Sequence, residues 1–185
     1  MSFTALKDSF SGAARPSERR AVFGPDAPVL SSIYDDDVNL TVWDRKLSAE
    51  IVTAADQLVT ADRGFQLSLM TSPETVAASL RQALPDQAEA LVLDISELVD
   101  MFAYLFDLKR VGLRLTVLEG AMCPKFHVDK VPCRLITTYL GSGTEWLPHS
   151  TRNRSMLGPS TQRPTDNSTV TDEVDSVTVE LSVGR

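Results

Sequence analysis

The fold class of this chain is decided by Val111-Gly-Leu-Arg-Leu-Thr-Val-Leu118, a stretch in which apolar and polar residues alternate. A period of two places the apolar side chains on one face of an extended segment, so this stretch predicts a β-strand. A second strand is predicted over 134–140, which is rich in β-branched and aromatic residues. The glycines at 141 and 143 then predict a turn.

Upstream of this stretch the apolar residues follow a helical period instead. Residues 44–59 predict an amphipathic helix, and residues 72–105 predict two more that are separated at Pro85. A short alternating strand is predicted at 65–69. Because helices come before strands rather than alternating with them, we expect an α+β fold: a helical N-terminal half followed by an antiparallel β region.

The two ends of the chain differ in composition from the middle. Residues 1–30 contain Ser, Gly, Pro and charges without a sustained period, and predict an irregular arm. Residues 31–158 predict a single α+β domain. Residues 159–185 are rich in Ser, Thr, Pro and Asp, and predict a polar, flexible tail. Within that tail, residues 175–183 alternate like one last strand but have no hairpin partner next to them.

The overall composition narrows the class of protein. A net charge of -7 and a pI near 4.8 argue against a nucleic-acid binder, which needs a basic face. No apolar run approaches the roughly 20 residues that span a bilayer, so no membrane partner is expected. Two cysteines do not make a disulfide framework, which favours a reducing, cytoplasmic location. A small-molecule substrate and the oligomeric state stay open.

Metal-ligand chemistry is concentrated in one short run of the sequence. In an extended segment, His127 and Asp129 would point to the same side. This is the His-x-Asp half of the 2-His-1-carboxylate triad that binds Fe(II), and His149 is the only other histidine that could complete it. The candidate metal ligands are therefore Cys123, His127, Asp129, Cys133 and His149.

The same residues allow other interpretations. Cys123, His127 and Cys133, completed by Asp129 or His149, would make a soft tetrahedral set suited to Zn(II), although the spacing matches no standard zinc finger. A nucleophilic cysteine would need a neighbouring base or cation to stabilise its thiolate. In a structural domain without a metal, the cysteines would be small buried hydrophobes and His127 would hydrogen-bond Asp129.

Two groups of acidic residues are predicted to be solvated rather than functional. Asp35-Asp36-Asp37 lacks the alternating ligands and the glycine of a calcium loop, so it indicates a turn before a strand at 39–43. Asp94, Glu97 and Asp100 recur every three residues, which is typical of a solvated helix face.

A family resemblance rests on two longer patterns. Residues 123–129 read Cys-Pro-x-Phe-His-x-Asp, and residues 138–146 read Thr-Tyr-x-Gly-x-Gly-Thr-Glu-Trp. Together with Asn39-Leu-Thr-Val-Trp43, they resemble a bacterial family known as domain of unknown function 1826, over about residues 30–158.

The resemblance implies a fold and two alternative metals. Members are similar in their His-x-Asp to iron- and 2-oxoglutarate-dependent oxygenases, which implies a partial jelly roll. Arg134 or Arg114 would then pair with a carboxylate of the co-substrate. Some members are associated with zinc-responsive gene clusters, which implies a zinc protein of metal homeostasis. The segment after Gly158 lacks the family's second histidine segment, so an atypical or truncated C-terminus is expected.

Overall fold

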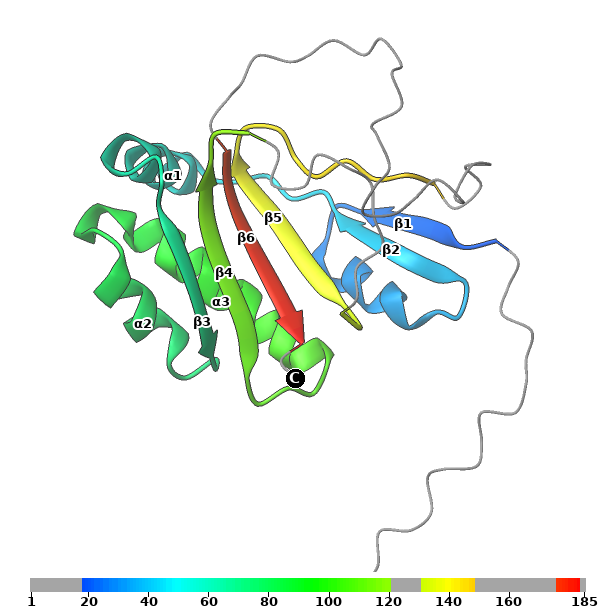
Figure 1. Ribbon diagram of the computed structural model, residues 1–185. Helices are drawn as coiled ribbons and strands as arrows, with labels where there is room; N and C mark the ends of the chain where they lie inside the picture. Colours follow the sequence, from blue (N-terminus) through cyan, green and yellow to red (C-terminus); the bar gives the residue numbers. More distant parts are fainter. Residues whose placement is uncertain (1–17, 121–130, 149–175, 184–185) are drawn as a thin grey trace, which may run out of the picture. The chain divides into compact units, whose positions relative to one another are not determined.

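The computed structural model in Figure 1 describes residues 18–120, 131–148 and 176–183. The chain divides into two compact units, with the boundary between Arg45 and Lys46. The first unit comprises the described residues up to Arg45, together with 147–148, and the remaining described residues form the second. A single domain was expected over 31–158. Its residues up to Arg45 instead belong to the first unit.

The first unit is a small parallel β-pair. Strands β1 (Arg20–Gly24) and β2 (Val38–Trp43) lie side by side and are joined through the 3-10 helix η1 (Ala27–Tyr34). The indole N–H of Trp43 donates to the carbonyl of Pro25 at 3.0 Å. The irregular arm predicted for 1–30 is therefore wrong for its last part, because pairing with β2 orders residues 20–24.

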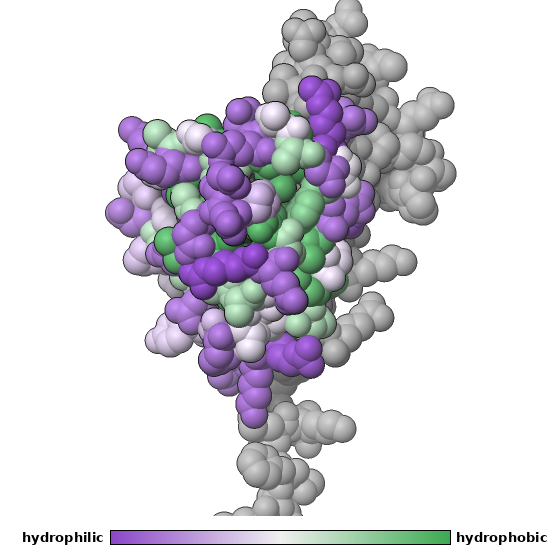
Figure 2. Space-filling view, turned by 90° about the vertical axis from the view of Figure 1, so that its left-hand side faces the viewer, coloured by the Kyte–Doolittle hydropathy of each residue, from purple (hydrophilic) through white to green (hydrophobic). Residues whose placement is uncertain are grey.

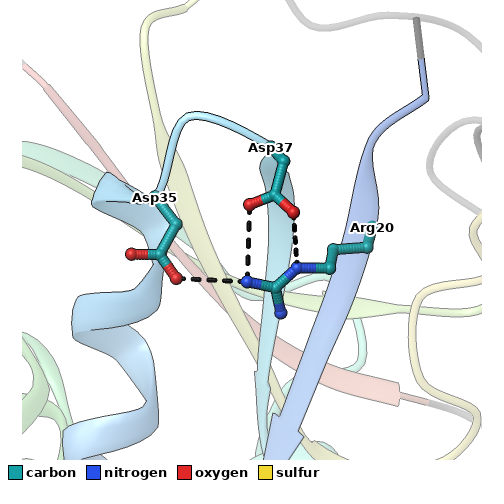
Figure 3. Close-up of polar contacts among 3 residues, drawn as sticks. All are labelled: Arg20, Asp35 and Asp37. Carbon is teal, nitrogen blue, oxygen red and sulfur yellow. Dashed lines mark hydrogen bonds and ion pairs between the residues drawn. The ribbon is translucent and has the colours of Figure 1, made fainter. Parts of the chain in front are cut away.

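The acidic triplet forms the predicted turn into β2, and one arginine binds its first and third carboxylates (Figure 3). Arg20 donates from Nε to Asp37 Oδ2 at 2.7 Å and from a terminal nitrogen to Asp35 Oδ2 at 3.3 Å. This contact is exposed to solvent. The hydrogen bond from Arg20 lowers the pKa of the Asp37 carboxyl.

Replacing Arg20 with glutamine should therefore raise the pKa of Asp37, which an NMR pH titration of the carboxyl group measures. A lowered folded-state pKa means that the contact stabilises the fold above the unfolded-state pKa and loses this effect as the pH falls through the folded value. The matched control is Arg19→Gln, which leaves the contact in place. An unchanged Asp37 titration in Arg20→Gln would contradict the assignment.

The second unit is built on a four-stranded antiparallel sheet with the order β3-β4-β6-β5. Its strands are β3 (Gln66–Thr71), β4 (Val111–Leu118), β5 (Arg134–Leu140) and β6 (Ser176–Val183). β6 lies between β4 and β5 and is antiparallel to both. The three strands of this sheet that were predicted from alternation and the one predicted from composition at 134–140 are all confirmed, and β4 and β5 run in the same direction.

Three helices cover one face of this sheet (Figure 1). They are α1 (Ala49–Ala61), α2 (Val76–Ala83) and α3 (Glu89–Leu105), and the 3-10 turn η2 (Asp86–Ala88) leads into α3. α1 begins where the Ser48 hydroxyl accepts a hydrogen bond from the amide of Ile51, which satisfies one of its free N–H groups. None of the helices in the described part is long and apolar enough to cross a membrane.

The core lies between these helices and the sheet. On β4 the residues at odd positions face the helices, and their register partners on β6 do the same. The fully buried side chains come from both layers and include Leu58, Leu80, Leu91, Ile95, Phe102, Leu113, Leu115, Val177, Val179 and Leu181. The α+β prediction is confirmed, although β1, β2 and β3 lie among the helices of the N-terminal half. The helical layer takes the place that a second sheet has in a jelly roll.

The prediction of a flexible polar tail over 159–185 is wrong for residues 176–183. Val177, Val179 and Leu181 have no exposed surface, and both sides of β6 are paired. The polar composition that suggested a tail belongs to the residues before this strand. Within the strand, apolar and polar residues alternate, and this alternation determines which side chains are buried. The partners of the last strand lie on β4 and β5, far from it in the sequence.

Candidate functional site

The sheet face that points away from the helices carries the polar residues of the four strands. We call this surface the helix-free face. It is formed by alternate residues that neighbour one another across the sheet: Gln66, Ser68 and Met70 of β3; Gly112, Arg114 and Thr116 of β4; Thr178, Glu180 and Ser182 of β6; and Arg134, Ile136 and Thr138 of β5.

Two arginines on this face lie on either side of Glu180. Arg114 is the direct cross-strand partner of Glu180 on β4. From β5, Arg134 donates to Glu180 Oε2 at 3.4 Å, and these two side chains are only 27% and 17% exposed. The two arginines proposed from sequence to bind a carboxylate are thus on one face, although they come from different strands.

A row of threonines crosses the same face next to these charges. The hydroxyls of Thr138 and Thr178 lie 3.5 Å apart, and Thr116 is the cross-strand partner of Thr178 on β4. Thr116 has no exposed surface, and its hydroxyl has no hydrogen-bond partner in the described structure. A buried polar group without a partner costs about 1–3 kcal/mol, so this hydroxyl lowers the stability of the sheet, and its burial keeps it out of reach of a ligand on this face.

Four of the five predicted metal ligands, Cys123, His127, Asp129 and His149, lie outside the described residues. The described residues on either side of the segment that contains the first three have known positions in the sheet. Leu118 at the end of β4 and Arg134 at the start of β5 pair with opposite ends of β6. The segment between them therefore joins the two ends of the sheet. Within the described ranges, no three His, Cys, Asp or Glu side chains group closely enough to hold a metal.

Cys133 is described, and it directly precedes Arg134. It is half-buried, and this burial raises the pKa of its thiol, although a hydrogen bond with the backbone of Arg134 opposes the shift. A raised pKa keeps the thiol protonated at neutral pH, which disfavours a nucleophilic role for this cysteine.

One polar pair was missed from the sequence. The predicted solvated helix face is wrong for Asp94, which is only 8% exposed and accepts a hydrogen bond from the Tyr139 hydroxyl at 2.6 Å. Glu97 and Asp100 are exposed as expected. Helical spacing alone predicts a shared face for the three acids, and it carries no signal for a tyrosine 45 residues away that reaches one of them from β5.

A known protein family matches most of this chain. Residues 24–183 match the family model described as "Protein of unknown function (DUF1826)". The chain belongs to the DUF1826 family. This confirms the family resemblance, and the match runs through β6, a strand inside the segment that was expected to be atypical for DUF1826. Neither the curated proteins nor the solved structures contain a match to the chain.

The DUF1826 assignment covers the elements that build the helix-free face. β3, β4, β5 and β6 all lie within the matched residues. DUF1826 is a family of unknown function, so the residues of this face are what indicates its chemistry.

Proposed function

We propose that this DUF1826 chain is a metal-binding protein of the non-haem iron oxygenase type. His127 and Asp129 would hold Fe(II), and Arg114 and Arg134 would hold a carboxylate-bearing co-substrate such as 2-oxoglutarate. The observation that carries the proposal is the placement of the two arginines on one sheet face around Glu180.

Charge on the helix-free face supports an anionic ligand. The two arginines and Glu180 leave one positive charge in excess, in a chain whose net charge is -7. Among the described residues, the Arg114 side chain has no ion-pair or hydrogen-bond partner, while Arg134 is positioned by Glu180. A guanidinium group binds a carboxylate through two parallel hydrogen bonds.

Connectivity supports a metal close to this part of the fold. The segment that carries His127 and Asp129 connects β4, the strand of Arg114, directly to β5, the strand of Arg134. An imidazole and a carboxylate are ligands that suit Fe(II) and leave positions open for a co-substrate. His149 is the one further histidine of the chain that could add a third ligand.

A zinc protein of metal homeostasis is the second candidate. Its ligands would be Cys123, His127 and Cys133. The supporting observation is that Cys133 directly precedes β5 and lies at the end of the segment that carries Cys123 and His127. A structural domain without a metal is the remaining alternative.

Metal content separates these candidates. The full chain, without a histidine tag, is purified under anaerobic conditions beside His127→Ala and Cys133→Ser, and its metals are measured by elemental mass spectrometry. We expect near-stoichiometric iron that is lost in His127→Ala and kept in Cys133→Ser. Zinc that is lost in both variants would replace iron with the zinc candidate. An intact chain without either metal would contradict both.

Substitution of the arginines tests the co-substrate. Arg114→Gln and Arg134→Gln should each weaken the binding of 2-oxoglutarate about tenfold, because each removes a charged hydrogen-bond donor. Isothermal titration calorimetry of the metal-loaded chain measures this change. The matched control is Arg110→Gln, which lies outside the helix-free face. Equal affinity in all three variants would exclude this face as the binding site.

A further inference from the structure

β3 forms an open edge of the sheet (Figure 1). The amide of Val117 donates to the carbonyl of Phe65 at 2.9 Å, so residues 65, 67, 69 and 71 direct their backbone groups toward β4. Residues 66, 68 and 70 then direct theirs away from the sheet. In the described structure, one side chain bonds to this edge: a terminal nitrogen of Arg110 donates to the carbonyl of Met70 at 3.5 Å.

The edge lacks the features that usually prevent strands from pairing. The sequence of β3 is Gln-Leu-Ser-Leu-Met-Thr, without a charge or a proline, and its register with β4 is uninterrupted. By contrast, β5 at the other edge carries Arg134 and an irregular register between Thr138 and Leu140. A regular, uncharged edge strand is a template for another strand.

We infer that β3 pairs with β3 of a second copy of this chain, in antiparallel orientation about a two-fold axis at Ser68. In this register Ser68 lies opposite the partner subunit's Ser68, and Gln66 lies opposite the partner subunit's Met70. Each outward N–H then meets an outward C=O in one register. The carbonyl of Met70, which already accepts from Arg110, thereby gains a second donor.

The side chains of β3 are complementary to themselves in the same register. Leu67 lies opposite the partner subunit's Leu69, and Leu69 opposite the partner subunit's Leu67. Both leucines are only half-buried in the single chain, whereas Leu113 and Leu115 on β4 are fully buried. Pairing would bury apolar surface on the helix side and would bring no like charges together.

The surface on this side agrees with such a contact. Figure 2 views the side of the molecule that holds β3 and α2, and it shows hydrophobic residues exposed between hydrophilic ones. Met70 is 45% exposed, and the partner's Gln66 would cover it. The axis is perpendicular to the sheet, so the two sheets would join into one and both helix-free faces would lie on the same side.

Sedimentation velocity of the full chain tests the inference. The wild-type chain should be a dimer, and Ser68→Lys and Ser68→Glu should each weaken it by about tenfold or more, because the substituted position meets itself across the axis. An equimolar mixture of the two variants should restore the dimer, since opposite charges then meet. Gln57→Lys and Gln57→Glu, which are exposed on α1, control for the change of charge.

Circular dichroism and thermal unfolding show whether each variant is folded. Met70→Lys is a second variant at an exposed edge position, and it should weaken the dimer without affecting the β3–β4 ladder. A monomeric wild-type chain would overturn the inference. A dimer that Ser68→Lys leaves unchanged, or a mixture that does not reassociate, would overturn it as well.

Discussion

A chain that ends at Asp175 should fail to fold its second unit, whereas a chain that ends at Val183 should fold like the full-length protein. The shorter chain lacks β6, which is paired on both sides and lies between β4 and β5. Val177, Val179 and Leu181 have no exposed surface, and each buried side chain of this size contributes about 1.5–3 kcal/mol. Together they approach the roughly 5–15 kcal/mol that stabilises a typical domain.

Far-ultraviolet circular dichroism and thermal unfolding of the two truncated chains measure this effect. The shorter one should show no cooperative transition, and the longer one should have the midpoint of the full chain. The pair differs only in residues 176–183, so any difference reports on β6. A cooperative transition in the shorter chain would mean that β4 and β5 find another arrangement.

Replacing Asp94 with alanine should lower the free energy of unfolding by about 1.5–3 kcal/mol, the range for a hydrogen bond to a charged group. The Tyr139 hydroxyl donates to this carboxyl at 2.6 Å, and both residues are buried between α3 and the sheet. Tyr139→Phe should cost a similar amount. Because both variants remove this shared hydrogen bond, the double variant should cost less than the sum of the two.

Chemical denaturation of the single and double variants measures the coupling. Asp100→Ala is the matched control on the same helix, because Asp100 is exposed and its loss should change stability by less than about 0.5 kcal/mol. An additive double variant would show that the two side chains do not depend on one another for stability.

The sequence predicts the local elements of this fold better than their pairing. Alternation correctly identifies β3, β4 and β6, and helical spacing identifies α1, α2 and α3, because both patterns arise from which side of a segment is buried. β5 is identified by its β-branched and aromatic composition. The position of β6 between β4 and β5 was not predicted, since no short-range pattern records which strands meet across a sheet. In the same way, helical spacing did not predict that Asp94 would be buried and bonded to Tyr139 on β5.

The helix-free face could be anticipated only in part. Arg114 and Arg134 were chosen through a family resemblance, and the register of β4, β6 and β5 explains why they share a face. Glu180 and Thr116 were not proposed, because their neighbours on this face come from strands distant in sequence. The metal ligands of the 123–129 motif remain predictions, since they lie outside the described residues.

The strand order also has a consequence for how the protein is made. A ribosome synthesises β4 and β5 well before residues 176–183, yet these two strands are held together by β6. Their facing edges therefore stay open during translation, and the contacts that close the sheet have a high contact order, as in the pairing of Arg134 with Ser182. Folding dominated by such distant contacts is slow, and nascent chains with open strand edges are prone to aggregate. We expect that production of this protein in a heterologous host depends on chaperones and on slow translation at low temperature.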